Sequence, residues 1–146
     1  MKPIVIPSKL LDQMEKHARA DYPNECCGFF FGNEQTGSRQ ILAIRTVENS
    51  KKGDKKRRFE ISAKEYMMAE RYGQERQLAL LGVYHSHPNH PAIPSKHDLK
   101  QAVPYFSYII MSVNRHQVKK ITSWQLIGDQ FIEEEIIIEN QIETLN

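Results

Sequence analysis

The histidines of this chain are concentrated in one short segment. Four of the six lie within residues 84–98, whose sequence is Tyr-His-Ser-His-Pro-Asn-His-Pro-Ala-Ile-Pro-Ser-Lys-His-Asp. The first two, His85 and His87, follow an apolar run from Leu78 to Tyr84 that has the length of a strand. Because side chains alternate between the faces of a strand, both imidazoles are expected on the same face. Two imidazoles placed in this way suit a small divalent metal ion.

A third metal ligand is expected from Asp98. Three prolines exclude regular structure between it and the histidine pair: Pro88, Pro91 and Pro94. Ser95 is predicted to be the N-cap of a helix that carries Asp98 in its first turn. A strand, a rigid loop and a helix start can therefore return Asp98 to His85 and His87. Two histidines and one carboxylate leave a fourth tetrahedral position for water, which is the pattern of a catalytic zinc site.

A zinc hydrolase also needs a general base, and Glu25 is the best candidate. It stands in Pro23-Asn24-Glu25-Cys26-Cys27-Gly28, between a turn-forming pair and an apolar run that continues to Phe31. A carboxylate at the start of a buried strand is costly unless it has a partner or a chemical task. The alternatives are an ordinary surface carboxylate for Glu25 and, for Asp98, a first-turn acid that interacts with the helix dipole.

Taken together, these residues resemble a known family. His85-Ser86-His87-Pro88, then Ser95-Lys96-His97-Asp98, with Glu25 upstream in a Glu-Cys-Cys-Gly context, are similar to the JAMM motif of the MPN+ metalloproteases of the JAB/MPN family. The resemblance implies that His85, His87 and Asp98 are the metal ligands and that Glu25 is the acid/base. It also implies that Ser95 orients the water and the oxyanion, and that Ser86 supports the site through hydrogen bonds.

The same resemblance implies a fold and an activity. Family members are zinc-dependent isopeptidases and peptidases that act beside the C-terminal tail of ubiquitin or ubiquitin-like proteins. The expected fold is α/β and similar to that of cytidine deaminases. It has a mixed, mostly antiparallel sheet, a long helix on each side and a metal cleft at the sheet edge. Dimers are common in the family, so a homodimer is a further option.

This chain is close to a minimal family core, which bears on its substrate. Compact members resemble bacterial enzymes that process sulfur-carrier proteins, which are small β-grasp proteins ending in Gly-Gly. We therefore expect Zn²⁺-dependent amide hydrolysis next to such a tail. Two alternatives stay open: a peptidase of phage-tail or cell-wall peptide type, and a non-catalytic MPN scaffold.

The elements that must position these residues follow from the spacing of apolar residues. Strands are predicted over residues 4–6, 26–31, 40–48, 78–84, 105–113, 118–127 and 131–138. Helices are predicted over residues 9–20 with Ser8 as N-cap, over residues 63–77 with Ser62 as N-cap, and over residues 95–102. His17, His90, His97 and His116 fall outside the matched motif positions; His17 is expected to be a packing or helix-surface residue, and the other three are expected to be exposed.

Residues 49–58 carry six basic side chains and one acidic one. We predict a solvated, mobile loop for this basic segment, and the alternative is a patch near the cleft that attracts an acidic partner surface. The adjacent Cys26 and Cys27 face opposite sides of a strand, so at most one could reach the site. The cysteine pattern of cytidine deaminases is absent, which favours free buried thiols.

Length and composition place the chain in a broad class. Its 146 residues predict a single domain over residues 1–146, with the family core at about 8–127 and a polar tail at 139–146. A net charge of +2 gives no reason to expect nucleic acid as a partner. No apolar stretch approaches the roughly 20 residues that span a bilayer, and the N-terminus lacks the apolar core of a signal peptide. We expect a cytoplasmic protein with reduced thiols and no membrane contact.

Overall fold

The structure is a computed structural model, and it describes residues 1–140. Along these residues the elements are β1 (Ile4–Pro7), α1 (Ser8–Asp21), β2 (Cys27–Glu34), β3 (Arg39–Val47), α2 (Ala63–Arg76), β4 (Ala79–Pro88), α3 (Lys96–Gln101), β5 (Ser107–Val113), β6 (Val118–Ile127), β7 (Gln130–Glu134) and β8 (Ile136–Glu139). The polar tail predicted for residues 139–146 lies mostly outside the described residues, and its first residue ends β8.

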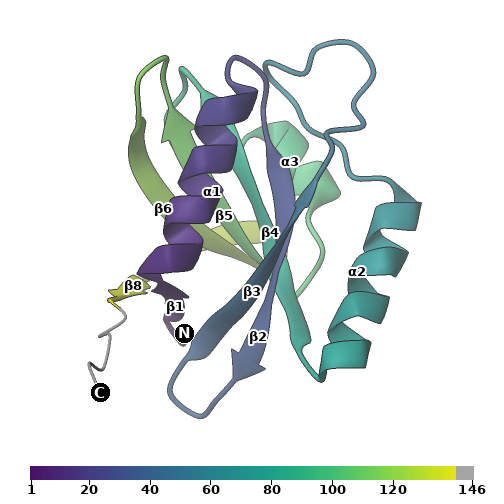
Figure 1. Cartoon of the computed structure of the whole chain (residues 1–146), viewed down its shortest axis with the longest axis vertical. Coiled ribbons are helices and arrows are strands. Elements are labelled where there is room, and N and C mark those ends of the chain that lie inside the picture. Colours follow the sequence, from purple (N-terminus) through teal and green to yellow (C-terminus); the bar gives the residue numbers. More distant parts are fainter. Residues whose placement is uncertain (141–146) are drawn as a thin grey trace, which may run out of the picture.

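One mixed sheet of eight strands organises the described chain, in the order β7-β6-β5-β4-β2-β3-β1-β8 (Figure 1). Four of the seven pairings between neighbours are antiparallel, and the other three are parallel. The single residue Glu135 joins β7 to β8, although these strands form opposite edges, so the sheet is curled and its edges approach each other. The predicted α/β class with a mixed, mostly antiparallel sheet is confirmed.

The two long helices cover opposite faces of this sheet, as predicted. Successive residues of β2 point into two separate cores. Phe30 belongs to the core that Met14 of α1 completes, whereas Phe29 and Phe31 belong to the core that Ala69 of α2 completes. Figure 1 shows α1 in front of the sheet and α2 at its right. Because both faces of the central strands are buried, these strands are continuous apolar runs.

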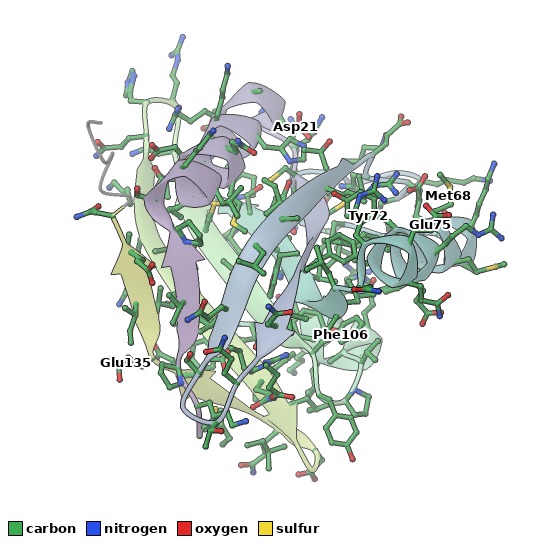
Figure 2. The ribbon with its side chains drawn as sticks, turned by 60° about the horizontal axis from the view of Figure 1, so that its bottom comes forward. Asp21, Met68, Tyr72, Glu75, Phe106 and Glu135 are labelled. Atoms are coloured by element: carbon green, nitrogen blue, oxygen red, sulfur yellow. The ribbon has the colours of Figure 1, made fainter. Side chains whose placement is uncertain are left out.

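The helix α2 packs on the sheet through its aromatic side. The ring centroids of Tyr72 and Phe31 are 4.8 Å apart. Figure 2 shows Tyr72 between α2 and the sheet, with Met68 and Glu75 turned away from the sheet. The hydroxyl of Ser62 accepts a hydrogen bond from an amide in the first turn, which confirms the predicted N-cap. Within residues 1–140, no helix is long and apolar enough to cross a bilayer.

Gly82 allows the parallel strands β4 and β5 to lie close together. A Cβ atom at this position would lie 1.9 Å from the carbonyl oxygen of Ser107 and 2.6 Å from the ring of Phe30. The oxygen belongs to the strand backbone, so it can move only if the strand pairing opens. We expect Gly82→Ala to lower the free energy of unfolding by about 3 kcal/mol, measured by urea denaturation. Gly37→Ala is the control, because its Cβ would meet nothing within 4 Å. Equal losses in both variants would contradict this account.

Two sequence predictions about element boundaries are wrong. Ser8 is not an N-cap: Pro7 occupies that position without a side-chain cap bond, and Ser8 is the first helical residue, because β1 runs directly into α1. The single strand predicted over residues 131–138 is two strands on opposite sheet edges. The first part alternates and pairs with β6, whereas the isoleucine run pairs with β1, and the chain changes partners at Glu135.

The predicted position of the metal cleft at the sheet edge is also wrong. The strand β4, which carries the histidine pair, lies in the interior of the sheet between β5 and β2. All residues from Leu81 to Pro88 are buried, and the strand includes both histidines instead of ending at Tyr84. The pairing with β5 continues to Pro88, which keeps this part of the chain extended. The candidate site therefore lies at the ends of central strands.

Candidate metal centre and active site

The strand β4 presents the two motif histidines on one face. Their ring centroids are 5.0 Å apart, and His85 is completely buried while His87 is 8% exposed. The His85 ring stacks on Phe59 at 4.4 Å between centroids. In the sheet His85 is opposite Cys27, which belongs to the core beneath α2, so both imidazoles project on the α2 side. The predicted same-face pair is present in the structure.

The capping geometry of α3 turns Asp98 toward this pair. The Ser95 hydroxyl oxygen accepts a hydrogen bond from the Asp98 amide at 3.0 Å, and the Asp98 carboxylate accepts one from the Ser95 amide at 2.8 Å. In this position, Oδ2 of Asp98 lies 3.2 Å from Nε2 of His87, and Oδ1 lies 3.8 Å from Nε2 of His85. A tetrahedral zinc ion with bonds of about 2.0 Å holds its ligand atoms about 3.3 Å apart, which these separations resemble.

The charge of Asp98 is fixed by its surroundings. Burial on its own would raise the pKa of the Asp98 carboxyl, but the adjacent His85 ring, the hydrogen bond with His87 and the Ser95 amide together outweigh burial and lower that pKa below its ordinary value. The carboxyl group is therefore ionised at neutral pH. A carboxylate must be ionised to bind a metal ion.

The loop between β4 and α3 orients His87. Its Nδ1 donates to the carbonyl of Pro91 at 2.9 Å, which leaves Nε2, 3.2 Å from Oδ2 of Asp98, as the ring atom that faces the cluster. The loop is fastened to the sheet at two carbonyls: Ser112 Oγ donates to His90 at 2.5 Å, and Thr122 Oγ1 donates to Ala92 at 2.7 Å. The imidazole is thus held by a rigid support, as metal-binding histidines usually are.

Glu25 enters the same cluster from the segment before β2. Its side chain is 3% exposed, and Oε1 lies 3.4 Å from Nδ1 of His85. Among the described residues, Oε1 and both ring nitrogens of His85 are buried without a hydrogen-bond partner. Glu25, His85 and His87 bring ligand atoms within 4.8 Å of one another. Unpartnered buried polar atoms cost free energy, and a divalent metal ion bound to one ring nitrogen of His85 would give that atom a partner, so the donor set fits such an ion.

Ser86 lies between the two histidines in sequence, but its hydrogen bonds go to the backbone of Cys26, directly before β2. It is completely buried, and its hydroxyl oxygen accepts a hydrogen bond from the Cys26 amide at 2.8 Å. Its own amide donates to the Cys26 carbonyl at 3.2 Å. These two bonds fix the chain directly after Glu25, which gives a concrete geometry for the supporting role expected of Ser86.

Ser95 keeps a donor for the site. Its hydroxyl oxygen is used as an acceptor in the helix cap, but a hydroxyl group has a proton to donate as well. The residue is exposed and lines an open pocket of about 530 Å³. Capping and oxyanion orientation are therefore compatible. The pocket is lined by Glu25, Arg57, His87, His90, Pro91, Ile93 and Ser95.

The basic segment, residues 49–58, is attached to the site. Its side chains are mostly exposed, as predicted for a solvated loop. Its backbone is not detached, because the Glu25 amide donates to the Lys55 carbonyl at 2.7 Å, and Arg57 lines the pocket. Sequence reasoning missed Arg57 and the buried Asn49, whose side chain contacts the Glu25 carbonyl. The position of an asparagine directly after the strand predicted over residues 40–48 is a signal that could have indicated Asn49.

The cysteines are free buried thiols, as predicted. Cys26 and Cys27 belong to the cores on opposite faces of the sheet. Burial raises the pKa of Cys26 to about 12 and raises that of Cys27 as well, so both thiols stay protonated. A protonated thiol is a poor metal ligand.

The remaining histidines lie outside the cluster. His17 packs on Tyr84, with Nδ1 2.7 Å from the phenol oxygen, and lies 3.3 Å from Asp21. His90 and His116 are exposed as expected. His97 was expected to be exposed too, but it is half-buried because it contacts Gln101 one turn later in α3.

The family to which the chain belongs follows from comparison with known proteins. The sequence-family model for prokaryotic homologs of the JAB domain matches residues 7–127. The chain is therefore a member of this prokaryotic branch of the JAMM/MPN family.

Curated relatives carry names of hydrolases. The chain is similar to a CysO-cysteine peptidase of Mycobacterium tuberculosis, with 26% identity over 139 residues that cover 94% of this chain and 92% of the relative. It is 30% identical over 105 residues to a probable TtuB-protein conjugate cleaving protease of Thermus thermophilus, covering 70% of this chain and 67% of that protein. A desampylase of Pyrococcus furiosus is 33% identical over 76 residues, covering 52% and 50%.

Solved structures show the same fold. A solution structure of a protein from Desulfitobacterium hafniense has a TM-score of 0.82 and 30% identity, and covers 96% of this chain and 95% of its own. One from Salinibacter ruber has a TM-score of 0.71 and 37% identity, with 95% and 92% covered. The JAB/MPN fold expected from the motif is thereby confirmed.

Proposed function

We propose that this protein is a zinc-dependent metallopeptidase or isopeptidase. Its substrate is a ubiquitin-like protein of the sulfur-carrier type, and it hydrolyses an amide bond next to the C-terminal Gly-Gly tail. The observation that carries the proposal is the buried cluster of Glu25, His85, His87 and Asp98, of which Glu25 and His87 line an open pocket. The names of the relatives add support, because one is a CysO-cysteine peptidase and another a protease of protein conjugates.

In this proposal His85, His87 and Asp98 hold the metal ion. The ionised Asp98 carboxylate lies between the Nε2 atoms of the two histidines and supplies the negative charge that a divalent cation needs. A zinc ion bound there would supply Lewis acidity, which makes water a nucleophile at neutral pH. The hydrogen bond from His87 to Pro91 and the stacking of His85 on Phe59 keep both rings in place.

Glu25 moves the proton. Its carboxylate takes one proton from the attacking water as the water oxygen bonds to the scissile carbonyl carbon. It then gives a proton to the nitrogen when the carbon–nitrogen bond breaks, so that a carboxylate and an amine leave. The Ser95 hydroxyl, which lines the same pocket, donates to the oxygen that becomes negatively charged.

One part of the pocket wall supports a proposed contact with substrate. Ile93 is 60% exposed on the fastened loop, between the 530 Å³ pocket and a neighbouring groove of about 370 Å³ that Trp124 also lines. An exposed apolar side chain on a rigid support beside reactive groups is suited to contact a substrate. A Gly-Gly tail has no side chains, so it can pass close to this wall.

Ile93→Asp is expected to weaken substrate binding. Loss of one buried isoleucine contact costs about 1.5–3 kcal/mol, so we expect KM to rise about 10- to 100-fold while kcat changes little. Ile127→Asp is the matched control, because this isoleucine is 52% exposed at the other end of the sheet. Steady-state kinetics of both variants make the comparison. A KM for Ile93→Asp equal to that of the control would remove Ile93 from the substrate site.

The function is tested with defined substrates. The metal-loaded full chain is incubated with a β-grasp protein whose Gly-Gly tail is extended by an amino acid or linked to a lysine side chain. Intact mass spectrometry is expected to show loss of the extension, with a chelator blocking the reaction. Cleavage of cell-wall peptides alone would favour the alternative peptidase class, and cleavage of nothing by a zinc-loaded protein would favour a scaffold.

A further inference from the structure

The position of the Glu25 carboxylate depends on the main chain around it. The residue lies in the short stretch between α1 and β2, outside both elements. Its buried Oε1 lies 3.4 Å from Nδ1 of His85 but has no hydrogen-bond partner among the described residues, so no hydrogen bond of that atom fixes its direction. The position of the carboxylate therefore depends on whatever holds the main chain of residues 24–26.

That main chain is held from two sides. On the side of β4, Ser86 bonds to both polar groups of the Cys26 backbone. On the side of the basic segment, the Glu25 amide donates to the Lys55 carbonyl at 2.7 Å, and the Glu25 carbonyl accepts from Nδ2 of Asn49 at 3.1 Å. Both backbone groups of Glu25 itself are thus satisfied by the segment that follows β3.

Asn49 holds this segment together. It is 6% exposed, and its carboxamide makes four hydrogen bonds. Nδ2 donates to the carbonyls of Glu25 and Arg58, and Oδ1 accepts from the amides of Lys51 and Glu60 at 3.0 Å each. An asparagine side chain has two donor hydrogens and two strong acceptor sites, and here all of them are used. No other natural side chain of this size offers the same set.

We propose that Asn49 is a positioning residue for the reaction. It does not line the 530 Å³ pocket that contains His87 and Ser95, and its contact with Glu25 is through the backbone carbonyl, so the role proposed for it is exerted through Glu25. It anchors the Glu25 carbonyl directly, and it anchors the Glu25 amide indirectly by closing the segment that contains Lys55. This inference rests on the acid/base role proposed above for Glu25. Catalytic groups displaced by about 1 Å can lose about 100-fold in rate, so the rate should depend on this anchor.

Two variants and a neighbouring control test the proposal. Asn49→Ala removes all four bonds. Asn49→Asp has the same shape and keeps the acceptors for Lys51 and Glu60, but it loses the donors to Glu25 and Arg58. Ser50→Ala is the control, because Ser50 also bonds within the segment, to the Glu60 carbonyl at 2.8 Å, without touching Glu25. Each protein is assayed for zinc content, kcat, KM and hydrogen exchange at the Glu25 amide.

We expect kcat to fall about 10- to 100-fold in both Asn49 variants, with KM within about twofold of the wild type and zinc retained. Hydrogen exchange at Glu25 should accelerate in these variants and stay unchanged in Ser50→Ala. A folded Asn49→Ala with wild-type kcat would overturn the proposal, and so would an equal loss in Ser50→Ala, a loss of zinc or a failure of both variants to fold. If wild type and Glu25→Gln are equally inactive, the proposed function fails, and the exchange rates still decide whether Asn49 holds Glu25.

Discussion

Glu25→Gln is expected to lower kcat for amide hydrolysis by about 10²- to 10⁴-fold and to leave bound zinc unchanged. Glutamine has the same size as glutamate, so the buried position between His85 and the pocket stays filled. A carboxamide cannot take a proton from water or pass one to a leaving amine. The three residues proposed to hold the metal are untouched. Elemental analysis and steady-state kinetics on the same preparation measure both quantities.

Glu48→Gln is the matched control for this prediction. Glu48 is exposed near Glu25 and does not line the 530 Å³ pocket, so the same chemical change there should leave kcat within about twofold. A Glu25→Gln protein that keeps more than about a tenth of the wild-type rate would exclude Glu25 as the acid/base. Simultaneous loss of zinc and activity would instead identify Glu25 as a metal ligand, which its 3.4 Å separation from His85 makes a meaningful alternative.

Local rules were sufficient to predict the arrangement of the motif. The period of a strand places His85 and His87 on one face, and their ring centroids are indeed 5.0 Å apart. The N-cap preference of serine predicts the start of α3, and the reciprocal cap is what turns Asp98 toward the histidines. Both rules concern residues within a few positions of each other, and such patterns are visible in the chain itself.

Long-range pairing was less accessible to sequence reasoning. The interior position of β4 depends on its partners, since β2 and β5 come from distant parts of the chain. The isoleucine run of β8 looks like a continuation of β7, and only the availability of β1, which β8 joins to become the sheet edge, explains why it pairs elsewhere. A periodicity argument gives the faces of a strand but does not identify its neighbours.

Residues that support Glu25 were missed for the same reason. Asn49 and Glu25 are 24 positions apart, and the bond between them exists only because the end of β3 lies beside the start of β2. Charge content therefore predicts a solvated loop for the basic segment, although its backbone is bonded to the candidate acid/base. Charge content predicts the exposure of side chains well, but it does not reveal which carbonyl a backbone amide will reach.

His85→Ala is expected to abolish metal binding, and metal removal is expected to destabilise the protein. His85 is completely buried, and neither ring nitrogen has a hydrogen-bond partner among the described residues. An ion that binds only the folded state adds about 2.7 kcal/mol of stability when its free concentration is 100 times its dissociation constant. We therefore expect about one zinc per wild-type chain, a clear fall in Tm after chelation, and no zinc in the variant.

His90→Ala separates the metal site from nearby histidines in general. His90 is exposed and lines the same pocket, but it is not part of the buried cluster, so this variant should keep its zinc and its chelator-sensitive Tm. Elemental analysis and calorimetry with and without chelator give both results. Zinc retained in His85→Ala, or lost in His90→Ala, would show that the ion binds elsewhere. If the chelator does not change the Tm of the wild type, the buried cluster is stable without a metal ion, and the hydrolytic proposal would then lose its basis.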